Sequence, residues 1–169
     1  SIDTIIDKAS VEQQYELSRG YSFLQAYLGL RVDFINLSAM LRLKMVGQDR
    51  DSFEESFLPH GTLKKDVFKT WWDASQESLS LDIPRTEPFG GLKEGLRRVS
   101  DDFVLLEREM QEVEIEFLLS TRRLTFGYEP LVGYSVLKRV ERRNIGKVVT
   151  GLRYGLEPEI TRRSIAWFD

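Results

Sequence analysis

Cysteine is absent from the sequence of 169 residues. Its absence excludes disulfides, thiolate metal sites and cysteine catalysis, and it suits a reducing compartment. The one histidine, His60, lies in a Pro-Gly turn, and no acidic or nucleophilic residue stands at a suitable spacing from it. We therefore expect neither a catalytic triad nor a histidine metal site.

Signals for membrane insertion, secretion and phosphate binding are also lacking. No apolar run approaches the roughly 20 residues needed to span a bilayer. No basic segment followed by an apolar one marks a signal peptide at the start. Gly90 and Gly91 are not followed by the Lys-Ser/Thr pair of a phosphate-binding loop. The first residue is Ser1 and not methionine, which suggests a fragment of a longer protein.

The net charge of −3 is unevenly distributed along the chain. Residues 1–119 carry 14 basic and 22 acidic side chains, whereas residues 120–169 carry 10 basic and 5 acidic ones. Such a split indicates docking against other charged surfaces, with an ordinary solvated surface as the alternative. We expect no nucleic-acid partner, because the chain is acidic overall and no recognition motif accompanies the basic part.

Apolar residues recur at helical spacing through most of the chain, and no segment has the pattern of a strand. The predicted helices cover residues 2–19, 22–46, 49–57, 62–75, 92–99, 100–124, 130–154 and 157–167. The polar stretch 76–91 is predicted to be a loop with room for one helical turn. Thr62 and Ser100 are the predicted N-caps of their helices. The predicted fold is therefore all-α, with long antiparallel helices.

One stretch of the chain occurs twice. Gly20, Tyr21, Leu24 and Tyr27 are matched, 107 residues later, by Gly127, Tyr128, Leu131 and Tyr134. Asp33, Asn36 and Gly47 are matched, 108 residues later, by Glu141, Asn144 and Gly155. A period this long indicates duplicated helical modules and not a short-repeat solenoid. We predict one complete module over residues 1–127 and the start of the next over residues 128–169, packed together as a single unit.

The repeated acids and amides are candidate packing residues. At 100° per residue, Glu141 points into an apolar stripe beside Leu137 and Ile145, where a carboxylate must find a partner or lose its charge. We expect Asp33 and Glu141 to form salt bridges or hydrogen bonds between helices; an acid/base or cation site is the alternative. Asn36 and Asn144 are expected to hydrogen-bond to the backbone of a neighbouring loop, with a ligand role as the alternative.

Other acidic residues are weaker candidates. Asp101 and Asp102, with Glu107, suggest an aspartate-rich metal motif of isoprenoid-type helical enzymes. The spacing is wrong for that motif, and a helix start at Ser100 also accounts for the two aspartates. Glu109, Glu112 and Glu116 share a helix face that we expect to be solvated. No metal, cofactor or small-molecule substrate is therefore expected.

Basic residues near the C-terminal end form a candidate partner interface. Its members are Arg122, Arg123, Arg139, Arg142, Arg143 and Lys147. An acidic partner surface would suit this set, and a solvated face is the alternative. Arg122 and Arg123 also fall in the last turn of a predicted helix, where they complement its dipole.

Two stretches resemble the C subunit family of V/A-type ATPases, called subunit d in eukaryotes. The first stretch covers residues 23–37 and 41–47, and the second covers residues 129–134, 141–145 and 158–162 together with Gly151. In both, a long helix carries the pattern Asp/Glu-x-x-Asn followed by Leu or Ile, and a Gly-ended turn and a short helix follow. Members of that family have three such modules arranged as a funnel, so the chain resembles a C-terminal portion.

The resemblance implies a non-catalytic central-stalk subunit. Such a subunit lies between the stalk and the proteolipid ring of the membrane rotor, and it couples ATP hydrolysis or synthesis to transport of protons or sodium ions. It would be cytoplasmic and peripheral to the membrane through the ring. The alternatives are an isoprenoid-type enzyme with a metal site at Asp101 and Asp102, or an unrelated helical adaptor.

Overall fold

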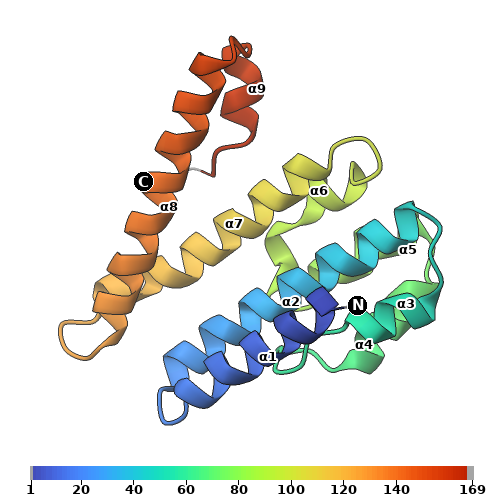
Figure 1. The fold of residues 1–169 in the computed structure, drawn as a ribbon, viewed down its shortest axis with the longest axis horizontal. Coiled ribbons are helices and arrows are strands. Elements are labelled where there is room, and N and C mark those ends of the chain that lie inside the picture. Colours follow the sequence, from blue (N-terminus) through green and yellow to red (C-terminus); the bar gives the residue numbers. More distant parts are fainter. Residues whose placement is uncertain (1, 167–169) are drawn as a thin grey trace. The chain divides into compact units, whose positions relative to one another are not determined.

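The computed structural model describes residues 2–166, and these form nine α-helices, three short 3-10 helices and no strand (Figure 1). The all-α prediction is therefore confirmed. The chain divides into two compact units, residues 1–75 and 76–169. This division follows packing, whereas the predicted module boundary after residue 127 follows the sequence repeat, and that boundary stays a prediction.

Unit 1 is built on one long helix. Its elements are α1 (Ile2–Leu17), α2 (Ser22–Met45), α3 (Arg50–Ser56) and α4 (Lys65–Asp73). Helices α1, α3 and α4 all pack on α2, and α1 lies alongside it in Figure 1. Apolar residues occur nearly all round α2, and Leu37, Met40 and Leu41 are among the most buried side chains of the chain. A helix with this pattern needs neighbours on several sides.

Two helix starts differ from the prediction. Helix α4 begins at Lys65 with Lys64 in the capping position, whereas Thr62 lies further back and bonds to α2. Asp102 and not Ser100 caps α7. In both cases a residue two positions from the predicted one takes the capping position, which is the usual scale of error for helix ends.

Unit 2 begins where a loop was predicted. Its elements are α5 (Gln76–Asp82), η1 (Ile83–Arg85), η2 (Phe89–Gly91), α6 (Lys93–Arg97), α7 (Phe103–Leu119), η3 (Ser120–Arg123), α8 (Glu129–Arg153) and α9 (Pro158–Arg163). The stretch 76–91 is mostly helical because Leu79, Ile83 and Phe89 are fully buried and give it a core of its own. Tertiary burial outweighs its polar, Pro-rich composition.

Close helix contacts in unit 2 occur at glycines. A Cβ on Gly133 of α8 would lie 2.3 Å from Thr121 Oγ1 and 3.2 Å from the Leu118 carbonyl oxygen. A Cβ on Gly151 would lie 2.2 Å from Thr161 Oγ1 of α9. The buried side of α8, with Leu137 among its residues, therefore faces α7, η3 and α9.

The repeat is visible in the helices. Helix α2 is followed by the short helix α3, and α8 is followed by the short helix α9 (Figure 1). Gly47 and Gly155, 108 residues apart, both have positive φ, at 70° and 64°. That conformation carries little steric penalty for glycine, and both long helices end there.

Candidate functional site

Asp33 holds a loop against α2. Its side chain is fully buried and accepts hydrogen bonds from the backbone N–H of Thr62 at 3.0 Å and of Leu63 at 3.2 Å. The Thr62 hydroxyl donates a third hydrogen bond to it. Burial raises the pKa of Asp33, although the hydrogen bonds from Thr62 and Leu63 act in the opposite direction. The carboxyl therefore serves as an acceptor for the backbone that leads into α4.

The two asparagines of the repeat make the same contact. Asn36 Nδ2 donates to the Leu58 carbonyl at 3.0 Å, and Asn144 Nδ2 donates to the Ala166 carbonyl, also at 3.0 Å. Asn36 also accepts from the Leu58 N–H at 2.9 Å. The Oδ1 atom of Asn144 is buried and has no hydrogen-bond partner among residues 2–166. In both copies the amide attaches the chain that follows the short helix to the long helix.

Glu141 is exposed, although its place in the apolar stripe predicted a side chain packed between helices. Its side chain is 47% exposed and forms an ion pair at 2.6 Å with Lys138, one turn earlier on the same helix. The apolar stripe around it is exposed too, whereas Leu137 and Val140 are buried. Of the apolar residues that flank Glu141, Leu137 is therefore covered by neighbouring elements, whereas Ile145 and Val148 are not.

The arginines of the candidate partner interface are at the surface. Arg123, Arg139, Arg142 and Arg143 are exposed, and within residues 2–166 none of these four has an acidic partner. Arg122 is also exposed, in η3. Arg139, Arg142 and Arg143, which lie on the long helix α8, are suited to bidentate contacts with carboxylates of another surface.

Lys147 differs from these arginines. It is half-buried, and its ammonium donates a hydrogen bond to the Ser164 carbonyl just after α9. Burial, followed by the nearby charge of Arg143, lowers the pKa of Lys147. This lysine therefore fixes α9 to α8 and is not a free part of the surface.

The predicted metal candidates lie apart from any ligand cluster. Asp102 accepts from the Leu105 N–H at 3.1 Å and caps α7, while Asp101 is exposed. Among the described residues, no group of three or more His, Asp or Glu side chains could hold a metal ion. The arrangement fits helix capping.

Glu109 is buried, contrary to the predicted solvated face. It is 9% exposed and accepts from the Gly95 N–H at 2.8 Å. Burial raises the pKa of Glu109, and this hydrogen bond opposes the rise. No local sequence pattern predicts this contact, because Gly95 lies in α6, which is a separate helix.

His60 has an acidic partner that its sequence position did not reveal. Its Nε2 lies 2.7 Å from Glu12 Oε2, and its ring stacks on Tyr15 at a centroid distance of 3.9 Å. Both partners belong to α1, so the pair attaches α1 to the loop before α4. In the part of the chain that the structure describes, the hydrogen-bond partner of His60 is this carboxylate and not a hydroxyl, so the pair gives no support for a triad.

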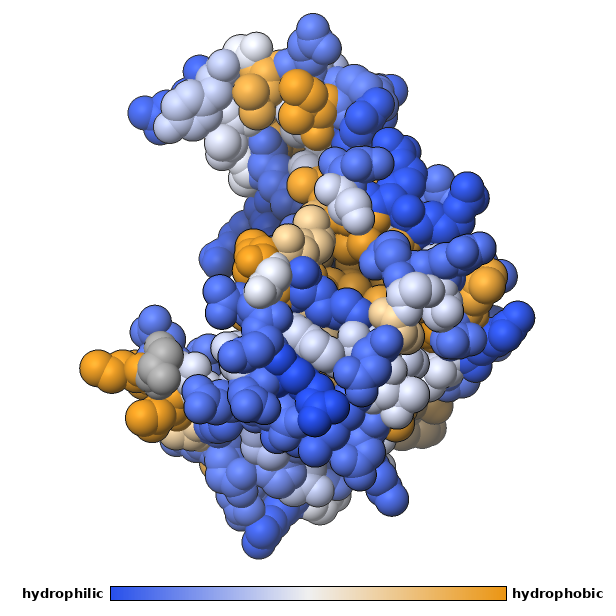
Figure 2. All heavy atoms as spheres, turned by 90° about the vertical axis from the view of Figure 1, so that its right-hand side faces the viewer, coloured by the Kyte–Doolittle hydropathy of each residue, from blue (hydrophilic) through white to orange (hydrophobic). Residues whose placement is uncertain are grey.

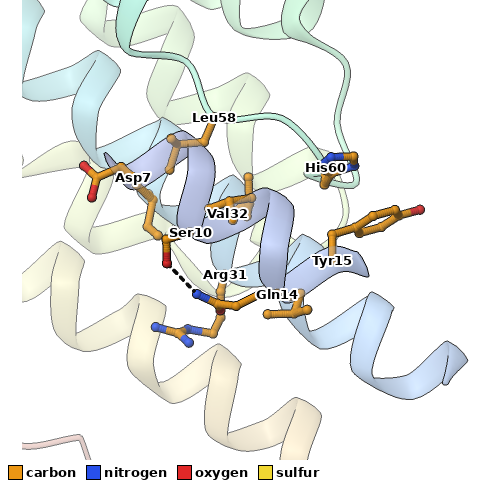
Figure 3. A pocket seen from close by; sticks show the side chains of 11 residues that line it. Asp7, Ser10, Gln14, Tyr15, Arg31, Val32, Leu58 and His60 are labelled. Atoms are coloured by element: carbon orange, nitrogen blue, oxygen red, sulfur yellow. Dashed lines mark hydrogen bonds between the residues drawn. The ribbon is translucent and has the colours of Figure 1, made fainter. Parts of the chain in front are cut away.

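A cavity of about 220 Å³ lies between α1 and α2 beside this histidine (Figure 3). Asp7, Tyr15 and Arg31 are among its lining residues. The Ser10 hydroxyl at its wall accepts a hydrogen bond from Gln14 Nε2 at 3.0 Å, drawn as a dashed line. The lining mixes charged, polar and apolar side chains.

Apolar side chains are exposed along α8 and α9. Figure 2 shows hydrophobic side chains among polar ones in the part of unit 2 where α8 and α9 join. The exposed set comprises Leu131, Tyr134, Ile145, Val148, Val149, Leu152, Leu156 and Ile160. Large exposed apolar patches beside charged residues mark interaction sites. None of the described helices has both the length and the apolar character needed to cross a membrane.

The chain matches one protein-family model. Residues 1–164 match the family described as ATP synthase (C/AC39) subunit. Neither the curated proteins nor the solved structures with which the chain was compared gave a match. The family match covers nearly all of the sequence, and it agrees with an all-helical chain built on a repeated long helix. The chain therefore belongs to the C/AC39 subunit family of V/A-type ATP synthases.

Proposed function

We propose that this protein is a non-catalytic central-stalk subunit of a V/A-type rotary ATPase. In this role it couples the stalk to the proteolipid ring of the membrane rotor, and thereby links ATP hydrolysis or synthesis to transport of protons or sodium ions. The observation that carries the proposal is the family match over residues 1–164. The protein would be cytoplasmic and held at the membrane through the ring.

The surface of α8 supports a role in assembly. Arg139, Arg142 and Arg143 project from a helix of 25 residues that is anchored to its neighbours by close contacts at Gly133 and Gly151. Anchoring of this kind suits the proposed coupling role. The exposed arginines of α8 give the surface a positive charge that an acidic stalk or ring loop would complement.

Co-purification tests the proposal. The tagged chain should retain central-stalk subunits and the ring from a membrane extract at low ionic strength. The triple variant Arg139→Glu, Arg142→Glu, Arg143→Glu should retain at least about tenfold less, because three attractive charges become repulsive. Retention by the unmodified chain should also fall as salt rises from about 0.05 to 0.5 M, because exposed charges are screened.

A matched control comes from the same unit. Arg85 and Arg97 are exposed but paired with Asp82 and Glu94, and they lie outside α8. The double variant Arg85→Glu, Arg97→Glu should retain the partners like the unmodified chain. Failure of the unmodified chain to retain either stalk or ring would overturn the proposed function. Equal loss in both variants would overturn the assignment to α8 alone.

A further inference from the structure

The turn between α7 and α8 is longer than its counterpart between α1 and α2. Gly20 and Gly127 occupy equivalent places in the two turns, and both have positive φ. Four residues, 18–21, separate α1 from α2, whereas nine residues, 120–128, separate α7 from α8. The first turn shows that four residues are enough to join two packed helices at this place in the repeat. The additional residues of the second turn are therefore not needed to close it.

The longer turn carries two apolar side chains that the fold leaves exposed. Phe126 is 88% exposed, more than any other large apolar side chain within residues 2–166, and Leu124 is 48% exposed. Packing in this turn comes instead from Thr121, which is buried and lies in close contact with Gly133 of α8. An aromatic ring in water contributes nothing to folding through burial. Phe126 and Leu124 are therefore available to another surface.

The same turn is positively charged. Arg122 and Arg123 directly precede the exposed apolar residues, and both are exposed themselves. Residues 120–128 contain no acidic residue, and Glu129 follows in the first turn of α8, where it complements the helix dipole. The shorter turn has one arginine, Arg19, which pairs with Glu16 at 2.6 Å. Two positive charges beside exposed apolar side chains thus distinguish the second turn from the first.

The repeat itself leaves a turn at this place open. In unit 1 the chain that follows α3 meets α2 at Gly29, where a Cβ would lie 2.9 Å from Thr62 Cγ2, and at Lys44, which donates to carbonyls at the end of α4. Both contacts lie beyond the turn, and Leu17 beside it is 73% exposed. The exposure of the second turn therefore agrees with the module in which every neighbouring element is described.

The position and chemistry of the longer turn suit a bilayer surface. In Figure 1 the turn forms one end of the hairpin of α7 and α8. A bilayer accepts single apolar side chains from such an end and needs no matching pocket. Its phosphates accept bidentate hydrogen bonds from arginine, and aromatic rings favour the boundary between headgroups and acyl chains. Each arginine near an anionic leaflet strengthens binding by about fivefold.

We propose that the turn formed by residues 120–128 binds the surface of a bilayer that contains anionic lipids. Phe126 and Leu124 enter the boundary between headgroups and acyl chains, while Arg122 and Arg123 pair with lipid phosphates. The proposed function holds the chain at the membrane through the ring, whereas this contact is made with the lipid directly. The inference rests on the turn and not on the proposed function.

Vesicles test the proposal with the 169-residue chain. Vesicles of phosphatidylcholine with about 30% phosphatidylserine should bind it with an association constant of about 10³ M⁻¹, below the roughly 10⁴ M⁻¹ of a single myristoyl chain. Vesicles of phosphatidylcholine alone should bind at least about tenfold more weakly, because the arginines lose their anionic partners. Raising the salt from about 0.05 to 0.5 M should reduce this difference through screening. Co-sedimentation measures the bound fraction.

A fluorescent label locates the inserted segment. The chain has no cysteine, so Thr125→Cys provides a single labelling site between Leu124 and Phe126. An environment-sensitive fluorophore there should brighten and shift to shorter wavelengths when the anionic vesicles are added. Ser100→Cys is the control, because Ser100 is exposed and lies before the opposite end of α7. A label at that position should keep its spectrum.

Substitutions separate the apolar and the charged contributions. Phe126→Ser should weaken binding to the anionic vesicles about tenfold, whereas Leu17→Ser, in the shorter turn, should leave it unchanged. Arg123→Glu should also weaken it at least about tenfold, whereas Arg85→Glu, outside the turn, should change it less than about twofold. Because all four side chains are exposed, the variants should keep the helix content of the parent chain.

Four results would overturn the proposal. The first is no binding of the parent chain at about 5 mM lipid, where an association constant of about 10³ M⁻¹ would bind most of it. The second is equal binding to both kinds of vesicle, and the third is binding that ignores both Phe126→Ser and Arg123→Glu. The fourth is a label at Ser100→Cys that responds like the one at Thr125→Cys. These measurements use no other subunit, so they can fail while co-purification succeeds, and the reverse.

Discussion

Asn36 and Asn144 each donate an amide hydrogen bond of 3.0 Å to a backbone carbonyl 22 residues further along the chain. The equal spacing shows that the two long helices share a structural device as well as a sequence pattern. In each copy the amide attaches the segment that follows the short helix to the long helix. The two copies differ in the second half of the contact, because only Asn36 also accepts from its partner's N–H.

This difference predicts unequal losses of stability. Asn36→Ala should lower the free energy of unfolding by about 2–4 kcal/mol, because the buried N–H and carbonyl of Leu58 both lose their partner. Asn144→Ala should lower it by about 1 kcal/mol, since a single hydrogen bond from a partly exposed side chain is lost. Urea denaturation followed by circular dichroism measures both values. Equal losses would contradict the described asymmetry.

The repeated acids give a second comparison. Asp33→Ala should lower the free energy of unfolding by about 2–4 kcal/mol, because two backbone N–H groups and the Thr62 hydroxyl lose a buried acceptor. Glu141→Ala should change it by no more than about 0.5 kcal/mol, as an exposed pair within one helix contributes little. The same denaturation measurement applies. A large loss for Glu141→Ala would restore the original expectation of a packing role.

The outcome for these acids shows which features of the fold and the site can be predicted from the sequence. Periodicity and helix-ending glycines predicted the all-α fold, the two long helices and their repeat. Periodicity could not predict which apolar residues of α8 are covered, since Ile145 and Leu137 are both apolar and only Leu137 is buried. A helical wheel assigns a residue to a face, and tertiary packing decides whether that face is buried.

Contacts between residues that are far apart in the sequence could not be predicted either. His60 meets Glu12 across 48 residues, and Glu109 meets Gly95 in a different helix. No local pattern encodes either contact, because each depends on how two helices cross. Asn36 and Asn144 were easier to interpret, since the repeat placed the same amide on the same face twice and pointed to a shared scaffold.

Glu109 predicts a dependence of stability on pH. Burial raises its pKa in the folded chain above the ordinary value of 4.5. As the pH rises from about 4.5, the unfolded chain loses this proton first, so unfolding becomes easier until the folded chain is ionised too. Glu109→Gln removes this effect and keeps an oxygen that can accept from Gly95 N–H. The variant should gain stability relative to the parent chain as the pH rises through that window.

Denaturation in urea at several pH values from 3.5 to 8 measures this difference. Asp33, whose pKa is raised in the same direction, is present in both proteins, so its contribution cancels. Glu116→Gln is a suitable control because Glu116 is exposed on the same helix. It should show no comparable gain over the parent chain. A constant difference between Glu109→Gln and the parent across the whole range would contradict the role of burial.

Gly95 and Gly146 predict opposite effects for the same substitution. Gly95 lies in α6, and a Cβ there would come within 2.6 Å of Leu106 Cα and 3.0 Å of Leu106 N in α7. Backbone atoms cannot move aside as a side chain can, so α6 would have to shift away from α7. Gly95→Ala should therefore lower the free energy of unfolding by about 2–3 kcal/mol.

Gly146 lies within α8, and its Cβ would meet nothing within 4 Å. Gly146→Ala should raise the free energy of unfolding by about 1 kcal/mol, because alanine favours the helical backbone. Thermal denaturation of the two variants beside the parent chain measures both signs, and a loss at Gly146 would mean that its surroundings are not open in solution.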